Sequence, residues 1–322
     1  MKINIEDLKE LERNIDTIHP EEGKIPIRIL GFGEISLVFE IIGDNSNTAY
    51  KRIPIFDTEE QVKRHIWAYD EYNRILKEDI GLSIPDYGTA WFRRDNGEIA
   101  FYCVQEKIDP DSVGHKIIHE LSNTTDLENL VLLAIREMKK VWKFNETNEK
   151  GLKVGLDGQI SNFSLINYDI QNPHVDNNSK LMYLDTSTPM FRTDGEEAMD
   201  AELFLKSTPS FLRWLIKAFF LEDVVDRYYD WRRVIIDLIA NFYKEQKSEV
   251  IPDLINLANK FFDTEAFEFN IEPITPKEVK DYYKEDKMIW VIFQNARKID
   301  RFIKTKILRK KYDFYLPEKI KR

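Results

Sequence analysis

Alternating apolar and polar positions in the first hundred residues predict a set of short β-strands. Ile25, Ile27 and Ile29 alternate with Pro26 and Arg28, which is the period of a half-buried strand. Pro26 lacks a backbone N–H, so it belongs at the start or the edge of that strand. We expect strands over 25–30, 36–42 and 48–53, and a hairpin over 92–106 that turns at residues 95–97.

Helical spacing accounts for most of the remaining chain. Residues 1–20 predict a short amphipathic helix, and Thr58 with Gln61 forms a capping box that opens a second helix running to about Glu78. Residues 127–144 predict another helix, residues 153–185 predict loops and short strands, and the chain from Glu196 onward is expected to be nearly all helical. A strand-rich first third followed by helices is an α+β pattern.

The composition limits the compartment and the class of partner. Cys103 is the only cysteine among 322 residues, so no disulfide can form within one chain, and a reducing compartment is expected. We find neither a signal peptide at the N-terminus nor an apolar stretch long enough to span a membrane. The sequence therefore predicts a cytoplasmic protein.

The charge is unevenly distributed. The formal net charge is −10, yet residues 297–322 hold eleven lysines and arginines and only three acids. The acidic remainder argues against a general nucleic-acid binder. The basic tail could contact an anionic surface, although a solvated helix is the simpler interpretation.

Five polar elements follow one another in a suggestive order. They are the glycine-containing run Gly31–Val38, Lys51 in a strand, Glu71 on the capped helix, the loop Asp157–Asn162, and Asp185 after an apolar run. A glycine-rich turn lets backbone N–H groups approach phosphate oxygens, and carboxylate and amide oxygens suit Mg²⁺. Taken singly, these elements have plainer interpretations. Lys51 could be a surface residue of an edge strand, Glu71 a solvated helix charge, residues 157–162 a turn, and Asp185 the cap of a strand.

In this order the five elements resemble the protein-kinase-like superfamily, and within it the aminoglycoside phosphotransferase and choline kinase branch. The resemblance covers motifs within residues 25–195 and includes the run 102–108, which stands where the family's hinge holds adenine. It implies a two-lobed fold with an antiparallel-sheet N-lobe carrying one helix and a mostly helical C-lobe. We place the division between residues 1–107 and 108–322.

The resemblance also implies a role for each residue. Lys51 would hold the phosphates and pair with Glu71, Asp157 would accept or orient the proton of an acceptor hydroxyl, and Asn162 and Asp185 would bind Mg²⁺. These imply an ATP- and Mg²⁺-dependent transferase acting on the hydroxyl of a small molecule, to which the acidic body could attract a cationic acceptor. The residues expected around the nucleotide are Gly31, Gly33, Ser36, Val38, Lys51, Gln105 and Lys107.

The sequence departs from the family at three places. Ser36 stands where a third glycine is often found, Gly155 stands where the family has a histidine, and Thr186-Ser187 follows Asp185 in place of Phe-Gly. A pseudokinase-like nucleotide-binding or regulatory module, a protein kinase and a nucleotidyl transferase therefore stay open as alternatives.

Other groupings predict no chemistry. His115 and His119 are four residues apart, but the residues between them include no glutamate for a metalloprotease motif, so we interpret them as partly exposed helix residues. The later aromatic residues are expected in the core or groove of the helical part; they are Trp214, Phe219, Phe220, Tyr228, Tyr229 and Trp231.

Overall fold

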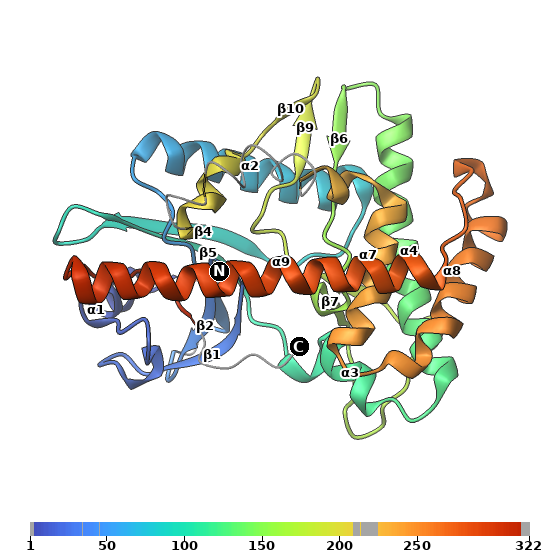
Figure 1. The fold of residues 1–322 in the computed structure, drawn as a ribbon, viewed down its shortest axis with the longest axis horizontal. Helices are drawn as coiled ribbons and strands as arrows, with labels where there is room; N and C mark the ends of the chain where they lie inside the picture. The colour runs from blue at the N-terminus through green and yellow to red at the C-terminus, as the bar shows by residue number, and fades with distance from the viewer. Residues whose placement is uncertain (1–2, 34, 45, 209–212, 214–224, 317–322) are drawn as a thin grey trace.

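The computed structural model describes residues 3–33, 35–44, 46–208, 213 and 225–316. An antiparallel sheet and two helices occupy the N-terminal part, and a mainly helical assembly follows (Figure 1). The α+β class expected from the sequence is confirmed at this level. None of the helices in the described ranges has both the length and the apolarity needed to cross a membrane.

The sheet has five strands in the order β1-β2-β3-β5-β4, and every neighbouring pair is antiparallel. The predicted strands and hairpin are all present, with shifts of up to five residues at their ends. The bounds are Ile27–Phe32 for β1, Leu37–Ile41 for β2, Thr48–Arg52 for β3, Tyr87–Arg93 for β4 and Ile99–Glu106 for β5.

Two helices accompany the sheet. Helix α1, Ile5–Asn14, buries Leu8 and Leu11 in a cluster with one sheet face. Helix α2, Glu59–Arg74, has the predicted capping box, and it continues as a π-helical turn over Ile75–Ile80. Gly81 then adopts a left-handed conformation with φ of 82°, which glycine reaches without steric cost.

The largest apolar cluster lies in the helical part and includes the inner side of α4. The helices are α3 (Gly114–Glu120), α4 (Thr124–Thr147), α7 (Trp231–Lys244), α8 (Ile251–Thr264) and α9 (Pro276–Phe302). Short strands lie between α4 and α7: β6 (Leu152–Val154), β7 (Phe163–Leu165), β8 (Leu181–Tyr183), β9 (Phe191–Thr193) and β10 (Glu196–Glu197). The 3-10 turns include Ile160–Asn162 and Arg227–Tyr229.

The long helix α9 carries the chain back toward the sheet. It crosses the front of the molecule in Figure 1 and continues as a π-helical turn over Ile303–Ile307. Tyr312 and Phe314 then join an apolar cluster with β5, and the Tyr315 ring lies 5.7 Å from that of Phe32. Residues 312–315, which the sequence assigns to the helical part, therefore pack on the sheet.

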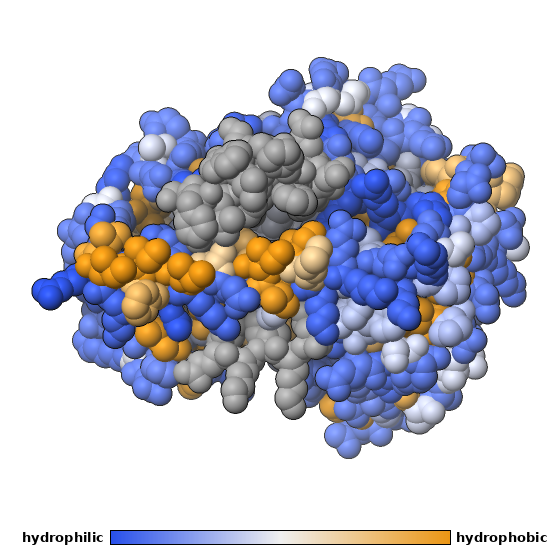
Figure 2. Space-filling model, in the orientation of Figure 1, coloured by the Kyte–Doolittle hydropathy of each residue, from blue (hydrophilic) through white to orange (hydrophobic). Residues whose placement is uncertain are grey.

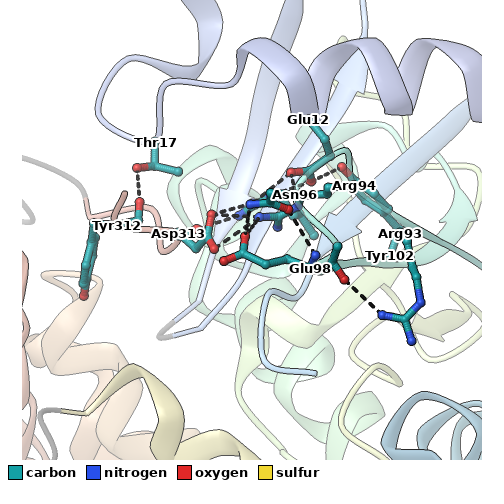
Figure 3. A network of polar contacts seen from close by, with 11 residues as sticks. Glu12, Thr17, Arg93, Arg94, Asn96, Glu98, Tyr102, Tyr312 and Asp313 are labelled. Atoms are coloured by element: carbon teal, nitrogen blue, oxygen red, sulfur yellow. Dashed lines mark hydrogen bonds and ion pairs between the residues drawn. The ribbon is translucent and has the colours of Figure 1, made fainter. Parts of the chain in front are cut away.

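A buried ionic network fastens this returning segment (Figure 3). Glu12 on α1 accepts two hydrogen bonds from Arg52, at 2.7 and 3.1 Å, and ion-pairs with Arg94 at 3.1 Å. Tyr102 also donates to Glu12, and Asp313 accepts from Arg94 at 3.1 Å. Burial alone would raise the pKa of Glu12, but the two guanidinium groups lower it to about 2. The network thus joins α1, β3, the β4–β5 hairpin and the returning segment.

Replacing Glu12 by Gln should destabilise the fold by roughly 3–5 kcal/mol near pH 7, because two buried arginines lose their buried charge partner and keep only the more exposed Asp313. The folded pKa is lowered, so the contribution of Glu12 is complete above its ordinary pKa of 4.5 and is lost as the pH falls toward 2. Urea unfolding over this range measures both effects.

The matched control is Glu6→Gln on the same helix, where the side chain is 80% exposed and pairs only with Lys9. This exchange should change stability by less than about 1 kcal/mol. Equal unfolding midpoints for Glu12→Gln and Glu6→Gln would contradict the stabilising role of the network.

Candidate active site

The register of β3 and β5 sorts polar side chains onto opposite faces of the sheet. Successive residues of a strand alternate between faces, and residues opposite each other on paired strands share a face. Lys51 pairs with Cys103, and Arg52 pairs with Tyr102. Because Arg52 and Tyr102 reach Glu12 on the α1 side, Lys51 is directed to the other face.

On that face Lys51 meets Asp185. The Lys51 Nζ lies 2.8 Å from the Asp185 Oδ1, and the two side chains are 22% and 26% exposed. Burial would lower the pKa of Lys51, but Asp185 outweighs it and the pKa is raised. Burial would raise the pKa of Asp185, but Lys51 and the Ser187 hydroxyl, which donates at 3.0 Å, lower it. Both members of the pair are therefore held in their charged forms.

The loop Asp157–Asn162 is fixed next to Asp185 by backbone and side-chain hydrogen bonds. The Asn162 amide donates to the Asp157 carbonyl at 3.2 Å, and the Leu184 N–H donates to the Asn162 carbonyl at 2.8 Å. The pairing of β7 with β8 continues from this contact. The predicted base and both predicted metal ligands thus belong to one hydrogen-bonded unit.

Asp157 lies in an unusual electrostatic environment. Burial, followed by the nearby charges of Asp237 and Asp185, raises its pKa to about 7. Gln159 links the two carboxyl groups: its N–H donates to Asp157 at 3.2 Å and its side-chain amide donates to Asp237 at 3.5 Å. A carboxyl that titrates near neutrality can both hold and release a proton.

Asp237 is a site residue that the sequence analysis missed. It lies on α7 and is buried, and burial raises its pKa despite the attraction of Arg227. The sequence does carry a signal, because Asp237 is a lone acid within the apolar run 234–240. A charge in such a run either breaks the core or serves a specific contact.

The packing around Gly155 shows why no larger side chain stands at this position, where the resembled family has a histidine. The Gly155 carbonyl accepts a hydrogen bond from the Tyr72 hydroxyl at 2.9 Å. A Cβ atom here would lie 3.1 Å from the Tyr228 carbonyl and 3.2 Å from the Tyr229 ring. A histidine does not fit without displacing these two residues, and the Tyr228 carbonyl accepts a hydrogen bond from the Leu156 N–H at 3.0 Å.

The expected ion pair between Lys51 and Glu71 is not formed. Glu71 instead pairs with Arg74 at 2.8 Å, and Arg74 also pairs with Asp79 at 3.1 Å. His65 on α2 lies close enough to Lys51 to be affected by its charge. Burial, and to a smaller extent the charge of Lys51, lowers the pKa of His65 to about 4. At about 3.6 residues a turn, the six residues from His65 to Glu71 turn Glu71 onto a different side of the helix.

The glycine-containing turn joins β1 to β2 at the edge of the sheet. The Gly33 N–H donates to the Ser36 carbonyl at 3.0 Å, while a Cβ on Gly31 would meet open space. Val38 pairs with Gly31 on one side and with Lys51 on the other, so these three share a sheet face. Glu34 lies outside the described residues.

The two residues expected at the hinge contact other parts of the protein. Gln105 donates to the Leu184 carbonyl at 3.0 Å and to the Thr186 hydroxyl at 3.1 Å, so it holds the residues on either side of Asp185. Lys107 ion-pairs with Glu40 at 2.8 Å. Both side chains therefore have protein partners in this structure.

The oxygen donors present suit a hard cation. Because Asn162 directs its amide nitrogen to Asp157, its Oδ1 points away from that contact. Together with the Asp185 carboxylate it offers oxygen ligands of the kind Mg²⁺ prefers, with phosphate and water left to complete the shell. No group of three or more His, Cys, Asp or Glu side chains forms a ready metal site within the described ranges.

The remaining sequence candidates lie away from this site or outside the described residues. His115 and His119 both lie on α3, and the pKa of His115 is lowered to about 4, first by burial. Trp214, Phe219 and Phe220 fall outside the described ranges. Tyr229 and Trp231 are buried in the core of the helical part, as expected.

Comparison with known proteins places the chain in a sequence family. The family DUF6206, described as a family of unknown function, matches residues 10–301. The chain belongs to this family. A search of curated proteins returns no significant match.

Two solved structures are similar to this DUF6206 protein over much of its length. One is the GDP complex of wild-type aminoglycoside 2'-phosphotransferase-IIIa, with 13% identity and a TM-score of 0.29, covering 73% of this chain and 91% of the other. The other is the GDP complex of a point mutant of that enzyme, with 12% identity and a TM-score of 0.30, covering 76% of this chain and 90% of the other.

The ligand-free protein should become less stable as the pH rises, because ionising the buried Asp157 carboxyl costs free energy. The folded carboxyl keeps its proton up to about pH 7, whereas an unfolded aspartate loses it near 3.8, so stability falls between these values. Asp157→Asn mimics the neutral form. It should raise the Tm by a few degrees at about pH 8 and change it little near pH 4.

Calorimetry of both proteins at several pH values measures this difference. Asp169→Asn, in an exposed loop where the amide keeps the turn, is the control and should leave the Tm unchanged at each pH. A Tm gain for Asp157→Asn that does not depend on pH would contradict the raised pKa.

Proposed function

We propose that this protein is a phosphotransferase that moves the terminal phosphoryl group of a nucleoside triphosphate to a hydroxyl of a small molecule. The observation that carries the proposal is the convergence of Lys51, Asp157, Asn162 and Asp185. A cation, a carboxyl of raised pKa and two oxygen ligands from distant parts of the chain meet there. Phosphoryl transfer needs mainly positioning and charge neutralisation, which such a set supplies.

Lys51 would exchange partners during nucleotide binding. In the ligand-free protein its ammonium is neutralised by Asp185. With a triphosphate in the site, Lys51 would bind phosphate oxygens, and Asp185 and Asn162 would be the residues that hold Mg²⁺. The cation, when bound, neutralises the charge of the phosphates. We expect Lys51 and Asp185 each to keep an oppositely charged partner, both without and with the nucleotide.

Asp157 would act on the acceptor. An acceptor hydroxyl placed against its carboxylate gives up its proton to Asp157 as its oxygen bonds to phosphorus, and the bond from phosphorus to the diphosphate leaving group breaks. The raised pKa makes Asp157 a better proton acceptor than an ordinary aspartate. The charge of Asp237 would help to keep this pKa raised, and Gln159 would hold the two carboxyl groups in place.

One observation favours a second candidate, a nucleotide-binding regulatory module without turnover. Lys51 is held by Asp185 and has no acidic partner on α2, since Glu71 pairs with Arg74. An Asp185 that stays on Lys51 could not take part in transfer. Binding and turnover therefore have to be measured separately.

Magnesium with ATP or GTP should raise the Tm of the protein by mass action. At about 100 times the Kd the gain corresponds to about 2.7 kcal/mol. Lys51→Met should abolish the shift because it removes the phosphate-binding cation. Lys277→Met, on a side chain that is 87% exposed, is the matched control and should keep it. An unchanged shift in Lys51→Met would exclude this site as the place of binding.

Glu71→Gln should leave nucleotide affinity within about twofold, because Glu71 contacts Arg74 and not Lys51. The binding titration used for Lys51→Met provides the measurement. A loss as large as that of Lys51→Met would mean that α2 rotates in the nucleotide complex and restores the pair that the sequence predicts.

Asp157→Asn should lower transfer to an identified acceptor by roughly 10²-fold or more, the range for losing a positioned general base. Nucleotide affinity should stay nearly constant because Asp157 does not contact Lys51 directly. Screening purified wild-type protein with labelled nucleotide and hydroxyl compounds identifies the acceptor. Tight nucleotide binding with no transfer in any reaction would support the regulatory module instead.

A further inference from the structure

The outer side of α9 exposes a row of large apolar residues. Met288, Val291, Ile292, Ile299 and Phe302 are each between 43% and 59% exposed. Their spacing of three, four and seven residues places them on one side of the helix. Just beyond the helix, Ile307 and Leu308 are 63% and 54% exposed. We call these seven residues the α9 face.

The α9 face follows one line along the helix and is not a scatter of single side chains over the surface. Figure 2 shows apolar side chains along the line of α9, at the front of a surface that is otherwise mostly hydrophilic. Exposed apolar residues that are gathered in this way mark an interaction surface, whereas single ones are normal. None of the α9 face is used by the site at Lys51.

The α9 face lies among basic side chains. Residues 287–311 contain nine lysines and arginines and a single acid, Asp300. Asp300 is buried and ion-pairs with Lys304 at 2.7 Å, so it presents little negative charge outside. The exposed cations that remain are Lys287, Lys298, Lys306, Arg309, Lys310 and Lys311.

A groove of about 290 Å³ opens near the end of α9, between Arg301 and Thr305 on one side and residues 15–18 after α1 on the other. Arg301 and Lys311 line it together with Ile15, Ile18 and Tyr312, and Asp16 is the one acid on its wall. Two cations beside apolar side chains suit a ligand with a negatively charged head and an apolar tail.

We propose that the α9 face docks on the surface of a bilayer that contains anionic phospholipid. Apolar side chains would enter the boundary between headgroups and acyl chains, and the flanking lysines and arginines would bind phosphate and carboxylate groups. The basic strip sits on a chain of net charge −10, so the acidic remainder would turn away from the membrane.

The charge pattern favours this partner over a second copy of the chain. A symmetric dimer through the α9 face would bring the same cations of both copies together, which is unfavourable. Nucleic acid would satisfy the cations but leave Met288, Ile292 and Phe302 without an apolar contact. A bilayer interface satisfies both.

Co-sedimentation with vesicles tests the proposal. Vesicles of phosphatidylcholine alone are compared with vesicles in which about a third of the lipid is phosphatidylserine. The full-length protein should bind the anionic vesicles at least tenfold better, and the preference should weaken at high salt. Equal binding to both, or to neither, would overturn the proposal.

Surface variants separate the two contributions. Ile292→Ser with Phe302→Ser should reduce binding at least tenfold, and Lys310→Glu with Lys311→Glu should remove the preference for anionic lipid. Phe267→Ser, at a phenylalanine that is 72% exposed elsewhere on the molecule, is the control and should bind like the wild type. All variants should keep the wild-type Tm, because the side chains are exposed.

Two further outcomes would count against a membrane partner. Wild-type vesicle binding retained by both double variants would place the contact elsewhere. A concentration-dependent dimer in solution that Ile292→Ser with Phe302→Ser converts to monomer would show that a second copy covers the α9 face. Light scattering without lipid detects that dimer.

Discussion

The contact between Lys51 and Asp185 is the constraint around which the candidate site is arranged. Lys51 comes from a strand of the five-stranded sheet, and Asp185 follows a short strand in the later part of the chain. Two partly buried opposite charges at 2.8 Å hold each other ionised, and removing either one would leave the other without compensation. Asn162 connects the loop Asp157–Asn162 to this contact: its carbonyl accepts from the N–H of Leu184, next to Asp185, and its side chain donates to the Asp157 carbonyl.

A second ionic network sets the position of Lys51 from the opposite face. Arg52, the next residue, binds Glu12, and Asp313 at the end of the described chain closes the network through Arg94. Because successive side chains of β3 point to opposite faces of the sheet, Lys51 points to the face opposite Arg52. The returning segment after α9 therefore bears on the site, although it touches none of the candidate catalytic residues directly.

Local patterns in the sequence were sufficient for much of this arrangement. Alternation predicted the strands, the Thr58 capping box predicted the start of α2, and the order of polar motifs predicted that Lys51, Asp157, Asn162 and Asp185 belong together. The ion pair predicted between Lys51 and Glu71 is absent from the structure, because spacing along the chain does not fix how a helix is rotated about its axis against a sheet. Asp237 and Asp313 were missed because neither belongs to a motif of the resemblance, and their partners lie 78 and 219 residues away in the chain.

The structure of the protein bound to Mg²⁺ and a non-hydrolysable triphosphate analogue tests the central claim most directly. The account predicts that Lys51 leaves Asp185 and contacts phosphate oxygens, that Asp185 and Asn162 coordinate the cation, and that the Asp157 carboxyl faces the space beyond the terminal phosphate. An analogue bound at another place, with the 2.8 Å contact between Lys51 and Asp185 intact, would contradict it.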